Sequence, residues 1–453
     1  MFAIRTLLLA LLTTLPLLAA ASPCGDWFFQ LQQAYQRAGI HDAQALTVPD
    51  VPHLGINRWL VFLRQQAHTP AQQQQWLRLA AAKAWQDQQL MLKRLPVSQR
   101  PATSVSAEQL LQRCIPALTA RTDFSALPDI AVADNYATWQ RVLGVYPLTA
   151  WLATGSINRY HRDMLARFTE PAKTPARLYL PVVNRSAVPT PASLSDNPLH
   201  VPLPDRQQLQ ALLGHYAPAL AVADNQPWNQ PGQIRLDASG PQVSGGPAAY
   251  YWPSWTRYQG HNLLQLNYEF WFSQRPAAGA LDIYAGKLDG LIWRVTLKPD
   301  GGVLFYDSIH PCGCYHKVYP VDPTLRQAHI KGDRPVFYPH KVADANQQRV
   351  MVLLQPDVHY VVRVAPLTPG VPAQSYALAP ATQLRALSKP DGSVTSLFNR
   401  HGRVPASHRG ERFALWPLGI PSAGTMRQPG THAIAFKGKR HFDDPQLPAT
   451  LFR

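Results

Sequence analysis

The sequence predicts an α+β protein in which a helical N-terminal region is followed by a C-terminal antiparallel β-sandwich or barrel-like domain. Apolar residues recur at helical spacing up to about residue 168, a proline-rich stretch follows, and apolar residues alternate beyond about residue 230. Helices have a period of 3.6 residues, whereas half-buried strands have a period of 2. We therefore place the boundary between the two parts within the proline-rich stretch.

The N-terminal segment, residues 1–21, has the features of a secretory signal peptide. Arg5 supplies positive charge, residues 7–18 are mainly apolar, and Ala19–Ala21 provides the small residues of a cleavage site. The apolar stretch is shorter than the roughly 20 residues that a membrane-spanning helix requires. We expect removal of this segment and a periplasmic or secreted protein without a transmembrane segment.

Residues 22–170 are expected to form a helical domain. Trp27, Phe28 and Leu31 repeat at helical spacing, and Pro70 occupies a favourable first helical position. Two cysteines lie in the predicted helices, Cys24 near the mature N-terminus and Cys114 in the fourth of them. Because exported proteins commonly contain disulfides, we predict a Cys24–Cys114 bridge.

The stretch 171–205 contains eight prolines, together with Ser, Thr and Asn. This composition is typical of a semi-extended linker. The alternative is that the stretch lies along the surface of one large body. A short helix around 207–213 should follow it, at the start of a β-rich domain that we assign to residues 206–453.

The β-rich domain is predicted from one long strand and three hairpins. Residues 264–272 alternate as a strand does. The hairpin turns are expected at 298–302, 355–357 and 389–392, where Pro, Asp and Gly interrupt apolar runs. Repeated strand–turn–strand units of this kind indicate an antiparallel sandwich or barrel.

Composition limits the classes of partner. Hydrophobic residues make up 46% of the chain and charged residues only 15%, which excludes a disordered protein. The net charge of +16 favours anionic surroundings. No run of adjacent Lys or Arg is longer than Lys439–Arg440, so no specific nucleic-acid site is expected. An anionic envelope component or a glycan is the expected kind of partner.

One short loop concentrates the chemistry of the sequence. Its alternating positions carry His310, Cys312, Cys314 and His316. On an extended strand these four side chains would share one face, with neighbours about 6–7 Å apart. Thiolates and imidazoles together suit zinc or copper, provided that the segment curls. The C-x-C-x-H order does not match the C-x-x-C-H motif of c-type haem attachment.

The two loop cysteines leave other interpretations open. A Cys312–Cys314 disulfide would close a very small ring, which would be easily reduced and therefore a candidate redox element. Free thiols, or pairing of either cysteine with Cys24 or Cys114, are the remaining alternatives.

Other chemical signals are weak. The sequence contains no nucleophile elbow, zinc-protease helix, P-loop or dinucleotide fingerprint, so catalytic residues stay unknown and no cofactor other than zinc or copper is predicted. Asp307, Ser308 and His310 are adjacent, but adjacency does not create a catalytic triad. We expect the charged residues of 408–411 and 440–444 to form surface turns rather than a site. An aromatic cluster could stack on sugars, although core packing is favoured for it; its members are Tyr250, Tyr251, Trp252, Trp255 and Trp271.

The leading hypothesis from sequence is an exported protein of unknown activity that is metal-binding or thiol-redox active through the loop of His310 and Cys312. The alternative is a non-enzymatic envelope protein that binds anionic or glycan ligands through a basic, aromatic-rich surface.

Overall fold

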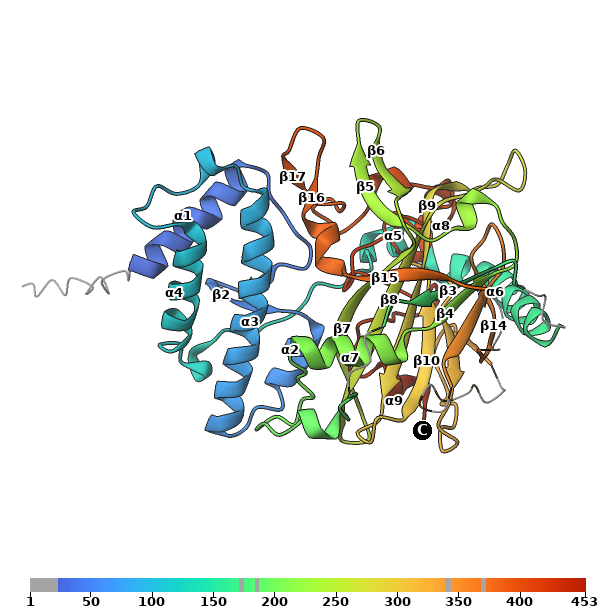
Figure 1. Ribbon diagram of the computed structural model, residues 1–453, viewed down its shortest axis with the longest axis horizontal. Helices are drawn as coiled ribbons and strands as arrows, with labels where there is room; N and C mark the ends of the chain where they lie inside the picture. Colours follow the sequence, from blue (N-terminus) through green and yellow to red (C-terminus); the bar gives the residue numbers. More distant parts are fainter. Residues whose placement is uncertain are drawn as a thin grey trace, which may run out of the picture.

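A computed structural model describes residues 23–170, 175–183, 187–338, 342, 344, 346, 348–367 and 372–453 (Figure 1). The predicted signal peptide therefore lies outside the described residues. The α-helices are α1 (Pro23–Arg37), α2 (Arg58–Arg64), α3 (Pro70–Arg94), α4 (Ala107–Thr119), α5 (Thr138–Leu143), α6 (Tyr146–Thr169), α7 (Arg206–Tyr216), α8 (Glu411–Leu415) and α9 (Leu447–Leu451). In the described part of the chain, no helix is both long enough and apolar enough to cross a membrane.

The first eight strands are β1 (Leu46–Val48), β2 (Val51–Ile56), β3 (Arg177–Pro181), β4 (Ala219–Val222), β5 (Gln233–Asp237), β6 (Gly240–Ser244), β7 (Ala248–Tyr258) and β8 (His261–Arg275). Those that follow are β9 (Gly286–Leu297), β10 (Val303–Ile309), β11 (Lys317–Pro320), β12 (Val336–Phe337), β13 (Val350–Leu354), β14 (Val361–Pro366), β15 (Gln374–Pro380), β16 (Leu387–Ser388) and β17 (Val394–Thr395). Helices are thus concentrated towards the N-terminus and strands beyond it, so the α+β prediction holds.

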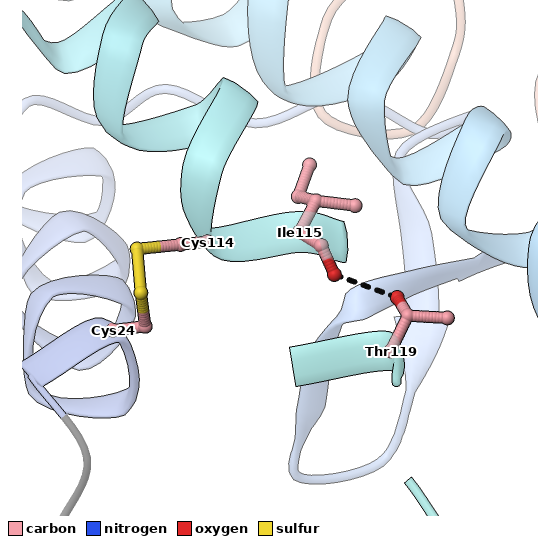
Figure 2. Close-up of a disulfide and its surroundings, with 4 residues drawn as sticks. All are labelled: Cys24, Cys114, Ile115 and Thr119. Carbon is pink, nitrogen blue, oxygen red and sulfur yellow. Dashed lines mark hydrogen bonds between the residues drawn. A yellow bond between two sulfur atoms is a disulfide. The ribbon is translucent and has the colours of Figure 1, made fainter. Parts of the chain in front are cut away.

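Helices α1, α3 and α4 pack against one another at the N-terminal end (Figure 1). Thr69 and Ser106 begin α3 and α4 with capping boxes, in which the side chain of the residue before the helix and that of Gln72 or Gln109 satisfy backbone N–H groups reciprocally. A disulfide joins Cys24 of α1 to Cys114 of α4, as the sequence predicts (Figure 2). The bridge ties the start of the described chain to a helix 90 residues later.

The remainder of the chain is built on one sheet of eleven strands, in the order β12-β11-β10-β9-β8-β7-β15-β3-β4-β13-β14. The sheet is mixed, because β11–β12, β4–β13, β3–β15 and β7–β15 are parallel pairs. It curls into part of a barrel (Figure 1). The predicted antiparallel sandwich is therefore wrong. Alternating apolar residues identify a strand, but they carry no information on which distant strand pairs with it, or in which direction.

The predicted linker contributes to this sheet. Strand β3 lies within 171–205 and pairs with β4 and β15, while residues 171–174 and 184–186 of the same stretch lie outside the described residues. Leu199 and Val201 are also buried, against α2 and α3. The prolines hide the strand in the sequence because they restrict it to a few residues between Arg177 and Pro181.

Two groups of elements cover the two faces of the sheet. Met164 and Phe168 of α6 and Leu212 of α7 join the main core beneath one face, which we call the α6 face. The C-terminal segment, residues 381–453, packs on the opposite face, which we call the C-terminal face. The last helix of the predicted helical domain thus packs on the sheet.

The predicted hairpins are confirmed where they depend on local turns. Antiparallel β9 and β10 flank the turn at 298–302, and antiparallel β13 and β14 flank 355–357. The third hairpin consists of β16 and β17, two antiparallel strands of two residues each, on either side of the turn at 389–392. A proline–aspartate or aspartate–glycine turn fixes the pairing of adjacent strands, which explains why sequence captures these contacts.

A buried ion network connects the N-terminal helices to the sheet. Arg385, which follows β15, donates hydrogen bonds to Asp42 at 2.9 Å and to Asp87 of α3 at 2.8 Å. Arg94 of α3 lies 3.5 Å from the same Asp42 carboxylate. Burial by itself would raise the pKa of Asp42, but Arg385 and Arg94 outweigh this effect and lower it.

We predict that Arg385→Met lowers the free energy of unfolding by about 3–5 kcal/mol, because the substitution leaves two buried carboxylates without their shared cation. Denaturant unfolding measures the change. Lys439→Met is the matched control, since Lys439 pairs with Asp134 at the surface, where both side chains are about two-fifths exposed. Its effect should stay within about 1 kcal/mol. Equal losses in the two variants would contradict the assigned role of Arg385.

Candidate functional site

The loop predicted from its cysteines and histidines connects β10 to β11 and is a tight turn rather than an extended strand. The backbone N–H of His310 donates to the carbonyl of Cys314 at 3.0 Å, and that of Gly313 donates to the carbonyl of His310 at 2.8 Å. Gly313 and Tyr315 both have left-handed backbone conformations, with φ of +89° and +64°. The chain therefore reverses within the loop, and the alternation of side chains expected for a strand is lost.

The reversal separates the two histidines. His310 lies on the α6 face, where its Nδ1 atom is 3.5 Å from a carboxylate oxygen of Asp289. His316 lies on the C-terminal face, where its Nε2 atom is 2.9 Å from a carboxylate oxygen of Asp307. Each imidazole is thus held by its own buried carboxylate. The expectation that all four side chains share one face is wrong.

Cys312 and Cys314 are buried on the C-terminal face beside Trp271 and Met426, and both are free thiols. Within the described ranges, no three His, Cys, Asp or Glu side chains gather in a way that could hold a metal ion. The zinc or copper centre of His310, Cys312, Cys314 and His316 therefore stays a prediction, and this arrangement lends it no support.

Asp289 of β9 is the centre of the polar network on the α6 face. It is completely buried. One carboxylate oxygen is 2.7 Å from Nδ1 of His359, and the other accepts a hydrogen bond from Arg409 at 3.1 Å. Burial by itself would raise the pKa of Asp289, but Arg409 and His310 hold it well below its usual range. Asp289 is therefore an anion that orients two imidazoles at once.

The Nε2 atoms of both imidazoles are buried and have no hydrogen-bond partner in the described structure. Burial lowers the pKa of His310 to about 4, against the opposing effect of Asp289. The imidazole of His310 is therefore neutral at neutral pH. Because the carboxylate at Nδ1 favours a proton there, the lone pair is at Nε2.

Two tyrosine rings and a lysine lie around the imidazole of His310. The rings of Tyr315 and Tyr360 lie 5.1 Å and 5.4 Å from the imidazole, measured between centroids. Lys317, at the start of β11, places its Nζ atom 4.8 Å from the centroid of Tyr360 and 5.9 Å from that of Tyr160 on α6. We call His310, Lys317, Tyr315 and Tyr360, together with Asp289, the His310 site.

Lys317 is unusual because it is only 1% exposed and no carboxylate of the described residues lies within ion-pair distance of it. Burial lowers the pKa of Lys317 to about 7. The aromatic faces stabilise the ammonium form only in part, since cation–π contacts are weaker than a buried ion pair. An anion brought into the His310 site would supply the missing charge.

Partly exposed residues border the site. The guanidinium of Arg275 lies 5.3 Å from the ring of Tyr284 and 5.8 Å from that of Tyr360, and it is 3.5 Å from the Tyr360 hydroxyl. Arg275, Tyr315 and Tyr360 all retain solvent contact, whereas His310 beneath them is 1% exposed. A ligand would therefore meet a cation and aromatic rings before it reaches the imidazole.

The segment 408–411, expected to form a surface turn, exposes His408 and Gly410 but buries its two charged residues, Arg409 and Glu411. Arg409 binds Asp289, and Glu411 is only 3% exposed. Burial raises the pKa of Glu411 to about 7, although Arg409 and Arg275 oppose the shift. The sequence interpretation fails here because the partner of Arg409 is Asp289, which lies 120 residues away in the sequence, so the local residue types do not reveal the burial.

Sequence reasoning found His310 but missed its partners Asp289, Lys317, Arg275 and Tyr360. A faint signal exists, since Asp289 and Lys317 are charged residues in strands that also carry large apolar side chains. Two members of the proposed sugar-stacking cluster, Tyr250 and Trp271, are buried in the core of the C-terminal face and so offer no exposed platform.

Comparisons of the chain with known protein families, with curated proteins and with solved structures find no match. The function must therefore be argued from the chemistry of the site itself.

We predict that Gly313→Ala destabilises the protein more than Gly392→Ala does. Both glycines are left-handed, so each substitution incurs the strain of that conformation, about 1–2 kcal/mol. A Cβ at position 313 would in addition lie 2.6 Å from the carbonyl oxygen of Ala433, whereas nothing lies within 4 Å at position 392. The overpacking adds about 1–3 kcal/mol in denaturant unfolding. Equal losses of stability in the two variants would contradict the prediction that the carbonyl of Ala433 limits the space at position 313.

Proposed function

We propose that the protein is an exported enzyme that performs general acid–base catalysis on an anionic substrate at the His310 site. The observation that supports this proposal most directly is the buried Nε2 atom of His310, which has no hydrogen-bond partner among the described residues. Lys317 lies nearby and has no carboxylate partner in the described part of the chain. Export is supported by the signal-like residues 1–21 and by the Cys24–Cys114 disulfide.

The roles follow from the contacts. Asp289 holds Nδ1 of His310, so Nε2 accepts a proton from the substrate or from a bound water. When the proton comes from a bound water, the oxygen of that water forms a bond to the phosphorus, sulfur or carbonyl carbon of an ester, and the bond from that atom to the leaving oxygen breaks. The ammonium group of Lys317 donates a proton to the leaving oxygen, so one water is consumed and the step balances. Buried and positioned acid–base pairs of this kind contribute about 10²–10⁴-fold to rate.

The anionic character of the substrate follows from charge. Lys317 and Arg275 bring two cationic groups to the site, and the charge of Asp289 is already paired with Arg409. The tyrosine rings of Tyr315 and Tyr360 offer apolar faces beside these cations. A phosphate, sulfate or carboxylate attached to an apolar or ring-containing group fits this combination.

The test compares His310→Asn with His316→Asn on 4-nitrophenyl esters of phosphate, sulfate and acetate. The two histidines belong to the same loop and each contacts a buried carboxylate, but they lie on opposite faces. We expect turnover to fall about 10²–10⁴-fold in His310→Asn and to stay near the wild-type value in His316→Asn.

The pH profile of kcat/KM provides a second readout. Activity should rise as pH increases through about 4, where His310 becomes a neutral base, and fall above about 7, where Lys317 loses its proton. Lys317→Met should remove the upper limb. The proposal would be contradicted if the wild type and His310→Asn hydrolysed every ester at the same rate. It would also be contradicted if His310→Asn and His316→Asn lost the same amount of activity.

A second candidate function is thiol redox chemistry, favoured by the free thiols of Cys312 and Cys314 on one turn. One thiolate would attack a disulfide of a partner, and the other thiol would displace the resulting mixed disulfide. The products are a Cys312–Cys314 disulfide and two partner thiols, so two electrons and two protons pass to the partner.

Burial should make this exchange slow. The adjacent Cys312 thiol and burial together raise the pKa of Cys314 well above its usual value, so little thiolate forms at neutral pH. We predict that glutathione disulfide slowly converts the pair to an internal disulfide, detected by mass spectrometry. Cys312→Ser should stop at the mixed glutathione adduct of Cys314. Thiols that stay reduced in wild type but react at once in denaturant would contradict a redox role.

A further inference from the structure

Large apolar side chains are concentrated on the exposed surface of α5 and the first half of α6. Trp139 is 61% exposed and Trp151 is 70% exposed. We call the following residues the α5–α6 surface, and each is more than half exposed: Trp139, Val142, Leu143, Val145, Leu148, Trp151 and Leu152. Contiguous exposed apolar patches of this kind mark interaction sites, because soluble proteins otherwise avoid them.

The exposed side of α6 changes from apolar to basic along its length. Leu148, Trp151, Gly155, Arg159 and Arg162 follow one another at intervals of three or four residues, and all are exposed. Residues at this spacing lie on one face of a helix. The described face therefore places apolar side chains at one end and two guanidinium groups at the other.

The charged residues of this segment are all basic. No Asp or Glu occurs between Asp134 and Asp163, whereas Arg141, Arg159 and Arg162 fall within that interval. The net charge of the whole chain has the same sign, at +16.

Further exposed apolar residues adjoin the α5–α6 surface. Helices α5, α6 and α8 all contact the short 3₁₀ turn Trp416–Leu418, and α8 carries Phe413, which is 70% exposed. The N–H of Glu411 donates to the carbonyl of Ile283 at 3.0 Å, which brings the loop of Leu281, 92% exposed, against α8. All three helices lie on the sheet half of the molecule, away from α1–α4 (Figure 1).

The same helix reaches the His310 site. Tyr160, between Gly155 and Arg162 on α6, lies 5.3 Å from the ring of Tyr315 and 5.9 Å from that of Tyr360. Tyr284, at the border of the site, follows Ile283 of the apolar loop directly. Helix α6 and the loop of Leu281 therefore contribute both to the exposed apolar residues and to the rings of the site.

We propose that the α5–α6 surface docks the protein on an anionic lipid bilayer. Tryptophan is enriched at the membrane–water interface, and helices that lie in the interface combine an apolar face with arginine or lysine. The headgroups of anionic lipids pair with Arg159 and Arg162, and the acyl boundary accepts Trp139 and Trp151. The proposal stands on exposure and charge, and it does not rest on the proposed catalytic function.

A second copy of the chain is a poorer occupant. In a twofold dimer the same surface meets itself, so Arg159 and Arg162 of both copies would be brought together with only one exposed acid per copy, Asp163, beside them. A bilayer of anionic lipids supplies the opposite charge over the whole surface.

The test is co-sedimentation of the purified full chain with vesicles of phosphatidylcholine alone or mixed with phosphatidylglycerol. We expect binding to the mixed vesicles, and a loss of at least about tenfold in affinity for Trp139→Ser combined with Trp151→Ser. Phe29→Ser is the matched control, because Phe29 is 65% exposed on α1, outside this surface, and should leave affinity unchanged. Every variant carries the same N-terminus, so residues 1–21 contribute equally.

The arginines are tested separately. Arg159→Gln and Arg162→Gln should each lower affinity for the mixed vesicles about fivefold. Arg113→Gln, at an exposed position of α4, should have no effect.

Failure to bind mixed vesicles, or equal losses in Phe29→Ser, would overturn the proposal. Release of the protein from vesicles by inorganic phosphate at matched ionic strength would also overturn the proposal, because it identifies a free anion as the ligand. Self-association without vesicles that the tryptophan substitutions abolish would overturn it as well. Activity on soluble esters is measured independently, so either proposal can fail alone.

Discussion

The buried charge of Asp289 is the constraint around which one end of the sheet is organised. A carboxylate removed from water is costly unless charges or hydrogen bonds compensate it. Its partners are Arg409, His310 and His359, which come from the segments before α8, after β10 and before β14. Because each segment must reach the same carboxylate, their mutual positions are fixed. The geometry of the His310 site is therefore a consequence of neutralising one charge.

Asp307 repeats this arrangement on the opposite face, where Arg294 and His316 compensate it. Burial would raise the pKa of Asp307, but Arg294 and His316 lower it. Two buried carboxylates thus draw the two histidines of one loop to opposite sides of the sheet. The turn between them requires the left-handed backbone of Gly313. Cys312 and Cys314 lie on this turn and are buried with it. Their positions in the sequence are therefore explained by the packing of the turn, without a shared chemical role for the two thiols.

Features that depend on local interactions could be predicted from the sequence. The capped helices, the hairpin turn at 298–302 and the disulfide all follow from neighbouring residues or from the oxidising compartment expected for the chain. The mixed sheet could not be predicted, because β15 pairs in parallel with β3 and β7, far away in sequence. In the candidate site, His310 was found through its motif. Lys317 was missed because its burial without a carboxylate partner is a tertiary property, invisible in a strand of four residues.

Helix α6 connects the interior chemistry to the outer surface. Met164 and Phe168 fix its second half in the core of the sheet, so the helix is held rigidly while Trp151 stays in water. Trp151 and Trp139 are both more than half exposed, and a group of large exposed apolar side chains is the kind of surface that interaction sites have. Tyr160 occupies the middle of the same helix and packs against Tyr315, with the ammonium group of Lys317 nearby. The helix that exposes Trp151 to solvent therefore also supplies one wall of the His310 site, through the ring of Tyr160.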